Sequence, residues 1–208
     1  GPEVIEPRFT FHGFRYVKIE GYPGELDPGK IKGLVIYSDL PATGEFSCSN
    51  PLIKQLQHNI LWSQKGNFLD VPSDCPQREK MGWTGDIQIY APTACFLMDC
   101  SGFLVKWLED LKADQKGDGL VPHIIPWLPD YPVYGPLGVG GSSGWGDACV
   151  IVPWTLYQYY GDKRILDEMY GTMKKWIGFI EKRSRGYIWS RGMHWGDWLE
   201  PGRPVYSY

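Results

Sequence analysis

The chain has 208 residues and a formal net charge of −3, with acidic and basic side chains interspersed along it. Proteins that bind nucleic-acid backbones use a basic patch, and the absence of one argues against such a partner. Aromatic residues make up 15% of the chain, which suits a protein that stacks flat rings on ligands, although most of its 10 Trp are expected in the core.

Residues 9–47 are predicted to form a few β-strands. FTFHGFRYVKIEG alternates around Phe14 and Ile19, and IKGLVIYSDL continues the pattern after a turn. So few strands are marginal by themselves. We therefore interpret residues 1–48 as the remnant of a β-sandwich domain with a linker, and residues 49–208 as a separate helical domain.

From residue 50 onward the apolar residues recur at helical spacing, and about five or six helices are expected. Asn50 followed by Pro51 predicts the start of the first helix. Residues 86–98 are apolar on nearly all sides, which predicts a buried helix with Asp86 as its cap. Ser101 is expected to cap a third helix, which has one apolar stripe and is predicted to lie at the surface.

Two further helices follow a long loop. Residues 114–144 hold many prolines and glycines, and a loop of that length with several aromatics is usually functional. Asp147 is predicted to open a mostly apolar helix, and Asp162 an amphipathic one. Buried and half-exposed helices thus alternate. This favours a mainly α fold, a partial (α/α)6 toroid, with an ordinary helical bundle as the alternative.

The segment of residues 70–86, DVPSDCPQREKMGWTGD, is the expected centre of function. Its prolines and glycines predict an ordered loop between two helices. It crowds four carboxylates together with two basic side chains and a tryptophan: Asp70, Asp74, Glu79 and Asp86 with Arg78, Lys80 and Trp83. A loop stabilised only by salt bridges remains an alternative interpretation.

A weak repeat adds aromatic and acidic residues to this loop. Trp83 to Asp86, Trp145 to Asp147 and Trp195 to Asp197 each join a tryptophan and a glycine to an aspartate before a predicted helix start. Helix capping would explain each aspartate alone. Three copies instead predict one cavity lined by rings and carboxylates, the two ingredients of a sugar site. His123 and His194 lie beside aromatic loops and could bond to a hydroxyl.

Glycoside cleavage needs a protonated carboxyl group and a second carboxylate. Glu79 is the best candidate for the acid, because the like charges of Asp74 and Asp86 favour its protonated form, whereas Arg78 and Lys80 oppose it.

DCPQREKMGWTGD at 74–86 resembles the signature of bacterial α-L-rhamnosidases, an inverting glycoside hydrolase family with an (α/α)6 catalytic barrel. FHGFRYVKIEG and SDLPATGEFSCSNPLI are similar to the β-domain and linker before that barrel. GDIQIYAPTACFLMD, GFLVKWLEDL, GWGDA and WGDWLEPG follow in the order of the family.

The resemblance implies roles for individual residues. Glu79 would be the general acid, while Asp74 and Asp86 would bind rhamnose hydroxyls and stabilise the cationic transition state. Arg78 and Trp83 would complete the pocket. Other expected substrate-binding residues are Trp145, Asp147, His194, Trp195, Asp197 and Trp198.

The family's general base is a glutamate farther along a barrel of twelve helices. The resemblance therefore implies that residues 49–208 form the first half of the barrel, and that this chain alone is inactive although the full-length protein is a hydrolase. The expected partner is a rhamnose-containing oligosaccharide, polysaccharide or glycoside, with neither metal nor cofactor. A carbohydrate-binding protein without turnover, another (α/α)6 glycosidase and a polysaccharide lyase remain alternatives.

The five cysteines form no CxxC pair and are interpreted as small core residues. The longest apolar runs are too short to span a bilayer. The resemblance implies a bacterial protein, and a periplasmic, secreted or cytoplasmic location is equally compatible with the sequence.

Overall fold

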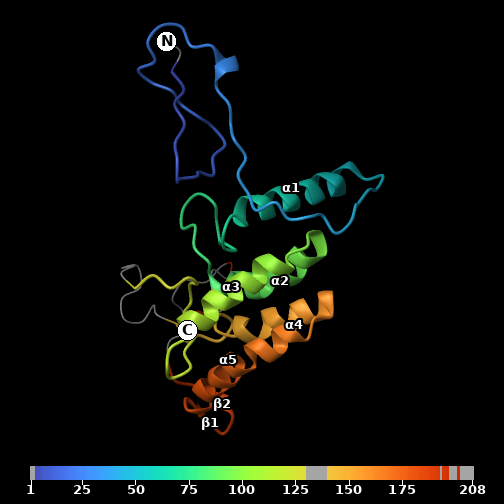
Figure 1. The fold of residues 1–208 in the computed structure, drawn as a ribbon, viewed down its shortest axis with the longest axis vertical. Coiled ribbons are helices and arrows are strands. Elements are labelled where there is room, and N and C mark those ends of the chain that lie inside the picture. The colour runs from blue at the N-terminus through green and yellow to red at the C-terminus, as the bar shows by residue number, and fades with distance from the viewer. Residues whose placement is uncertain (1–2, 130–139, 193, 197–200, 202–208) are drawn as a thin grey trace.

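The structure, a computed structural model, describes residues 3–129, 140–192, 194–196 and 201. A 3-10 turn, η1 (Pro28–Lys30), comes first, and a hairpin of β1 (Ser184–Arg185) and β2 (Ile188–Trp189) comes last. Between them the described chain forms α1 (Pro51–Asn67), α2 (Thr84–Leu97), α3 (Ser101–Asp114), α4 (Ala148–Tyr160) and α5 (Arg164–Glu181). In Figure 1 these elements descend in chain order, from the N-terminal segment at the top to the hairpin at the bottom.

The N-terminal segment, residues 3–49, corrects the prediction of strands over residues 9–47. Its described backbone is extended, with η1 as its regular element and one isolated bridge, between Ala42 and Met98. Side chains of the alternating pattern remain exposed, Phe14 at 64% and Tyr16 at 81%. A strand needs a neighbour that satisfies its backbone groups, and no described residue supplies a ladder here.

Helix α1 begins where the sequence predicts. The Asn50 side chain accepts a hydrogen bond of 2.9 Å from the Leu52 N–H, and Pro51 occupies the first helical position. Gln64 is the buried residue of this helix, while apolar residues of its first turns, such as Leu52 at 78%, are exposed. Helix α1 therefore contributes little to the core in the part of the chain that the structure describes.

The core lies between α2 and α4, which pack against each other, and α3 and α5, which cover α4. The apolar stripes of α3 and α5 are buried as predicted, by Leu104, Trp107, Leu108 and Leu111 and by Ile165, Met169, Trp176 and Phe179. This supports the predicted alternation of inner and outer helices.

Burial of α2 and α4 is less complete than predicted. Ile89 and Phe96 of α2 are 74% and 70% exposed, and Trp154 of α4 is 50% exposed. The described residues provide no neighbour for these sides of the two helices. No helix in the described ranges is long and apolar enough to cross a membrane.

The helix caps differ from the predictions in a way that affects the site. Helix α2 begins at Thr84, so Asp86 lies inside its first turn and does not cap it. The start of α3 is bound by Asp99, whose carboxylate accepts hydrogen bonds from the Ser101 N–H and hydroxyl at 3.0 and 2.6 Å. Because Asp86 is not used as a cap, its carboxylate is available for other chemistry.

Candidate active site

The loops that precede α2 and α4 meet at one end of the helices. The N–H of Ile125 donates to the Gly82 carbonyl at 2.8 Å, and the N–H of Thr84 donates to the His123 carbonyl at 2.8 Å. Trp83 and Ile124 form an antiparallel bridge between these two bonds. This short pairing fixes Trp83 at the start of α2. Trp83 lies near the end of the segment of residues 70–86, which we call the acidic loop.

The acidic loop contains a closed turn. At its base the Asp74 N–H donates to the Met81 carbonyl at 3.0 Å, and the Met81 N–H donates to Asp74 Oδ1 at 3.1 Å. Inside it, the Lys80 N–H donates to the Cys75 carbonyl at 3.1 Å, and the Glu79 N–H donates to Cys75 Sγ at 3.2 Å. We call residues 75–80 the acid turn. These bonds hold the backbone of Glu79 on both sides.

The carboxylate of Glu79 is oriented by an indole. Trp83 Nε1 donates to Glu79 Oε2 at 2.8 Å, while the nearest guanidinium nitrogen of Arg78 lies 3.6 Å from Oε1. The Arg78 side chain is 80% exposed, so the attraction between these two charges is screened by water. The bond from Trp83 therefore has the greater part in fixing the carboxylate.

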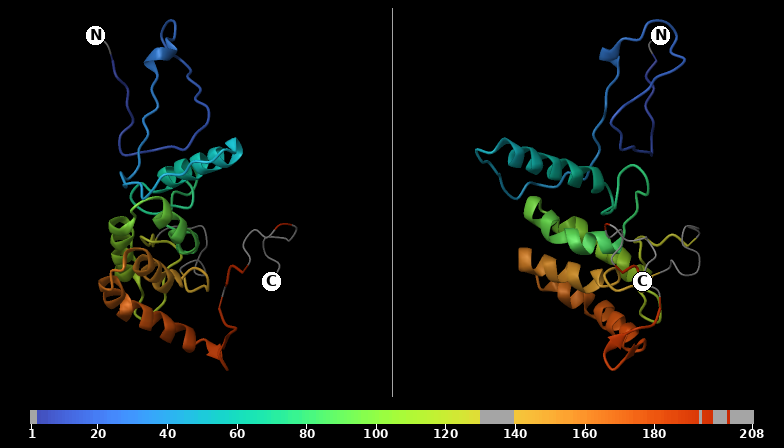
Figure 2. Two further views of the ribbon diagram at one scale, coloured as in Figure 1. Left: turned by 90° about the vertical axis from the view of Figure 1, so that its right-hand side faces the viewer. Right: turned by 180° about the vertical axis from the view of Figure 1, so that it is seen from behind.

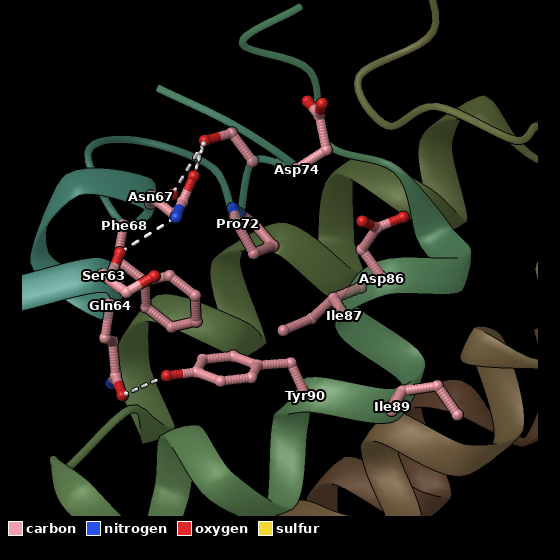
Figure 3. Close-up of a pocket in the computed structure, with 11 residues that line it drawn as sticks. Ser63, Gln64, Asn67, Phe68, Pro72, Asp74, Asp86, Ile87, Ile89 and Tyr90 are labelled. Atoms are coloured by element: carbon pink, nitrogen blue, oxygen red, sulfur yellow. Dashed lines mark hydrogen bonds between the residues drawn. The ribbon is translucent and has the colours of Figure 1, made fainter. Parts of the chain in front are cut away.

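Asp74 and Asp86 line a cavity of about 370 Å³. Figure 3 shows both carboxylates on the same side of the cavity, above a lining that includes Phe68, Ile87 and Tyr90. The Tyr90 hydroxyl donates to Gln64 Oε1 of α1 at 3.2 Å. Small-molecule sites have volumes of roughly 300–1,000 Å³, and apolar walls with a few polar groups are typical of them.

The pKa of Asp86 is raised to about 6. Partial burial of its carboxylate is the largest cause, and the negative charges of Asp74 and Glu79 add to it, while a backbone hydrogen bond acts in the opposite direction. The side chain still has an open path to solvent. Asp86 therefore changes its charge near pH 6.

The three tryptophans of the repeated motif gather around His123, whereas the sequence predicted that they line one cavity with the carboxylates. Ring centroids lie 6.3 Å apart for Trp83 and Trp195, 6.1 Å for Trp145 and Trp195, and 5.5 Å for His123 and Trp195. Trp83 and Trp195 are only 8% and 7% exposed, so their rings serve mainly as packing. The cluster is joined to the cavity through the bond from Trp83 to Glu79, and its rings are not among the residues that line the cavity.

The centre of this aromatic cluster was only partly anticipated from the sequence. His123 is 1% exposed, accepts from Trp195 Nε1 at 3.4 Å through Nδ1, and lies 2.8 Å from the Ser142 hydroxyl through Nε2. A neutral imidazole with its proton on Nε2 satisfies both contacts. The sequence indicates His123 only as a possible partner for a hydroxyl, and it gives no signal for Ser142, which lies in a glycine-rich loop without a recognisable motif.

Glycine in the motif permits close packing of rings on helix starts. A Cβ on Gly85 would lie 2.6 Å from Trp145 Nε1, and a Cβ on Gly146 would lie 2.3 Å from the Trp176 ring. The repeat therefore has a structural basis in addition to any role in binding. Each glycine lets a tryptophan approach the backbone directly.

Asp147 has partners within the protein. Its Oδ2 accepts from the Gly144 N–H at 2.7 Å, and its Oδ1 accepts from Trp176 Nε1 at 2.9 Å. The side chain makes no capping bond to α4, although the residue occupies the cap position. These bonds give Asp147 a structural role between the loop and α5, and its contact with substrate stays a prediction.

Replacing Asp147 with Ala is expected to lower the free energy of unfolding by about 1–3 kcal/mol, because the buried Trp176 N–H loses its acceptor. Denaturant unfolding of the full-length protein followed by Trp fluorescence measures this. Glu109→Ala is the control, since Glu109 faces Lys112, at 3.5 Å on an exposed surface of α3. Equal stability of the Asp147 variant and wild type would contradict the structural role.

The remaining predicted site residues lie near the end of the described chain. His194 Nδ1 lies 3.1 Å from the Ser143 hydroxyl, and the imidazole packs edge-on against Trp189 at 4.4 Å between centroids. Asp197 and Trp198 lie outside the described residues. Binding of substrate by these three residues stays a prediction.

Two protein families match the chain. Residues 41–207 match the bacterial alpha-L-rhamnosidase 6 hairpin glycosidase domain, and residues 1–37 match the bacterial alpha-L-rhamnosidase concanavalin-like domain. The mainly α fold, part of a six-hairpin toroid, is thereby confirmed. The predicted domain boundary between residues 48 and 49 stays a prediction.

Individual relatives agree with this match. An alpha-L-rhamnosidase from Streptomyces avermitilis is 45% identical over 200 residues, which are 96% of this chain and 19% of that protein. One from Formosa agariphila is 43% identical over 198 residues, which are 94% of this chain and 20% of that protein. The crystal structure of the Streptomyces avermitilis enzyme complexed with L-rhamnose superposes with a TM-score of 0.86 at 45% identity, over 94% of this chain and 18% of that one. The chain spans about a fifth of the length of these relatives.

Proposed function

Because the chain belongs to the bacterial α-L-rhamnosidase family, we propose that the full-length protein that carries it hydrolyses terminal α-L-rhamnosides with inversion at the anomeric carbon. The observation that carries the proposal is that Trp83 holds the Glu79 carboxylate in the same loop that places Asp74 and Asp86 on the cavity. The proposed substrates are glycosides, oligosaccharides or polysaccharides that end in rhamnose.

In the proposed reaction Glu79 donates a proton to the glycosidic oxygen. The bond between this oxygen and the anomeric carbon breaks, and its electron pair stays with the leaving oxygen. A water molecule attacks the anomeric carbon from the opposite face and gives its own proton to a general base. This chain supplies the acid of the proposed pair.

Asp86 and Asp74 are proposed to bind the sugar and stabilise the positive charge that develops on it. Above about pH 6 Asp86 is mainly ionised. Its negative charge then attracts and stabilises the positive charge of the oxocarbenium-like transition state. Trp83 is proposed to orient the acid through its indole N–H, and Arg78 to supply positive charge beside the Glu79 carboxylate. The roles of Asp74, Arg78 and Trp83 are supported by their position in the acid turn or beside it.

The proposal is tested with an aryl α-L-rhamnoside and the purified full-length protein. Proton NMR recorded during the first turnovers is expected to show β-L-rhamnose first, followed by mutarotation. Initial release of α-L-rhamnose would exclude inversion. Absence of hydrolysis, with other aryl glycosides cleaved instead, would assign the protein to a different glycosidase activity.

The pH dependence of the reaction should report Asp86. As pH falls through about 6 the carboxylate is protonated, its stabilising charge is lost, and kcat/KM declines. Asp74→Asn removes a negative charge that raises this pKa, so the acidic limb of the profile should move to lower pH, in addition to any loss of rate.

Asp70→Asn is the matched control for this profile. Asp70 lies in the same loop, is 84% exposed and faces Lys106 at 3.6 Å, and it is not among the groups that raise the pKa of Asp86. Its removal should leave the acidic limb in place. An acidic limb that stays fixed in the Asp74 variant would assign the limb to another group.

A further inference from the structure

Within described residues 3–36 of the N-terminal segment, Phe11 and Gly13 are half-buried, whereas the others are exposed. Both residues lie against the acid turn. Figure 2 shows the blue N-terminal loop coming down towards the loop between α1 and α2. The segment therefore has one anchored point in this range, and that point is beside Glu79.

Lys80 makes the contact from the side of the acid turn. Its Nζ donates to the Phe11 carbonyl at 2.6 Å and lies 4.7 Å from the centroid of the Phe11 ring. A lysine ammonium is attracted both to a carbonyl oxygen and to the face of an aromatic ring. One side chain thus binds two groups of a residue 69 positions away.

Gly13 packs against the first residues of the acid turn. A Cβ at this position would lie 3.0 Å from Gln77 Cβ and 3.2 Å from Pro76 Cγ, so even a methyl group would force these atoms to shift. The segment Phe11–Gly13 therefore touches the acid turn near both of its ends, on either side of Glu79 in the sequence.

The backbone of Lys80 is held in an unusual conformation. Its φ is +59°, in the left-handed region that residues with a Cβ seldom adopt, and its N–H closes the turn on Cys75. Strained residues of this kind persist when surrounding contacts hold them, and they are often found at functional sites. The two bonds to Phe11 supply such contacts directly after Glu79.

We propose that Lys80 is a positioning residue for the general acid, and that the concanavalin-like region holds Glu79 in place through Phe11. Phe11 lies in the region of residues 1–37 and Lys80 in the region of residues 41–207, so the contact joins the two matched domains. This inference rests on the proposed function, because it assumes that Glu79 donates a proton.

The test compares leaving groups in the full-length protein. A 2,4-dinitrophenyl rhamnoside departs without protonation, whereas a phenyl rhamnoside needs the acid. Lys80→Met keeps the length of the side chain but removes both contacts. It should lower kcat for the phenyl substrate about 10-fold and change kcat for the dinitrophenyl substrate less than about 2-fold. Lys80→Arg, which keeps a cationic donor, should recover most of the loss.

Lys65→Met is the matched control. Lys65 Nζ lies 4.7 Å from the Tyr37 ring, so it makes the same kind of contact with the N-terminal segment, away from the acid turn. This variant should affect neither substrate. Equal losses on both substrates in Lys80→Met, no loss on either, or a failure of Lys80→Arg to recover activity would each overturn the inference.

A second variant covers the case in which Lys80→Met fails to fold. Phe11→Leu keeps the carbonyl acceptor and removes the ring, so it should lower the phenyl rate about 2- to 3-fold while the dinitrophenyl rate is retained. Uniform loss or no loss would overturn the inference. A wild-type protein that cleaves neither rhamnoside would instead refute the proposed function, which separates the two failures.

Discussion

Glu79→Gln in the full-length protein is expected to lower kcat for phenyl α-L-rhamnoside by about 10²–10⁴-fold, the usual contribution of a general acid. Glutamine has the same size, and its carbonyl oxygen can still accept the hydrogen bond from Trp83 Nε1. Substrate binding should therefore be retained, with the loss concentrated in kcat. Steady-state kinetics together with calorimetric binding of rhamnose measure both effects.

The control for this variant is Glu109→Gln in α3, where the glutamate faces Lys112 at 3.5 Å on an exposed surface. It should leave kcat unchanged. Retained kcat in Glu79→Gln would contradict the assignment of the acid. Rhamnose binding without turnover in either protein would favour the carbohydrate-binding alternative. An unsaturated product released from a uronic-acid polysaccharide, with phenyl rhamnoside left intact, would favour a lyase.

The helices were predictable because their signals are local. Asn50 and Pro51 fix the start of α1 through one side chain and one ring, and the stripe of α3 is set by the period of its own residues. The strands predicted for residues 9–47, in contrast, are not formed by the described chain. Alternation identifies residues that suit a strand, but a strand also requires a partner that is distant in sequence.

The acidic residues show the same limit. Four aspartates stand near helix starts. Asp99 and Asp162 bind a backbone N–H of the helix that follows, as predicted for Asp162, whereas Asp86 and Asp147 make no capping bond. Asp147 is engaged by Trp176, which lies 29 positions away. A local pattern shows that an aspartate can cap a helix and cannot show which donor reaches it in the folded chain.

The crowding of charge in the acidic loop is visible in the sequence, but its effect on Asp86 is not. In the structure the pKa of Asp86 is raised, because burial acts on it together with the charges of Asp74 and Glu79. Burial depends on the packing of α1 and α2 around the cavity, which no local pattern reports.

The Glu79 carboxylate is held by a hydrogen bond more than by neighbouring charges. The sequence suggested that Arg78 and Lys80 act on the acid electrostatically. The structure leaves Arg78 largely in water and directs Lys80 to Phe11, while Trp83 binds the carboxylate. Orientation by an indole that is fixed in a short backbone pairing is the more economical explanation of how the acid is held.

The backbone pairing between Gly82 and Ile125 is expected to be essential for both stability and activity. Gly82→Ala is expected to lower the free energy of unfolding by about 2–4 kcal/mol, because the new Cβ would lie 2.0 Å from the Ile125 carbonyl oxygen. This oxygen also accepts from Trp107 Nε1 at 3.2 Å, and the Ile125 N–H binds the Gly82 carbonyl, so little room for adjustment remains.

Displacement of this pairing should also move Trp83 and with it Glu79, lowering kcat about 10-fold in the protein that remains folded. Thermal unfolding and hydrogen exchange of the amides at residues 82–84 and 123–125 measure the structural effect. Gly178→Ala in α5 is the control: a Cβ there meets no atom within 4 Å, and alanine should stabilise the helix by up to about 1 kcal/mol. If Gly82→Ala exchanged and melted like wild type, the pairing of the two loops would not be what holds Trp83 and the acid in place.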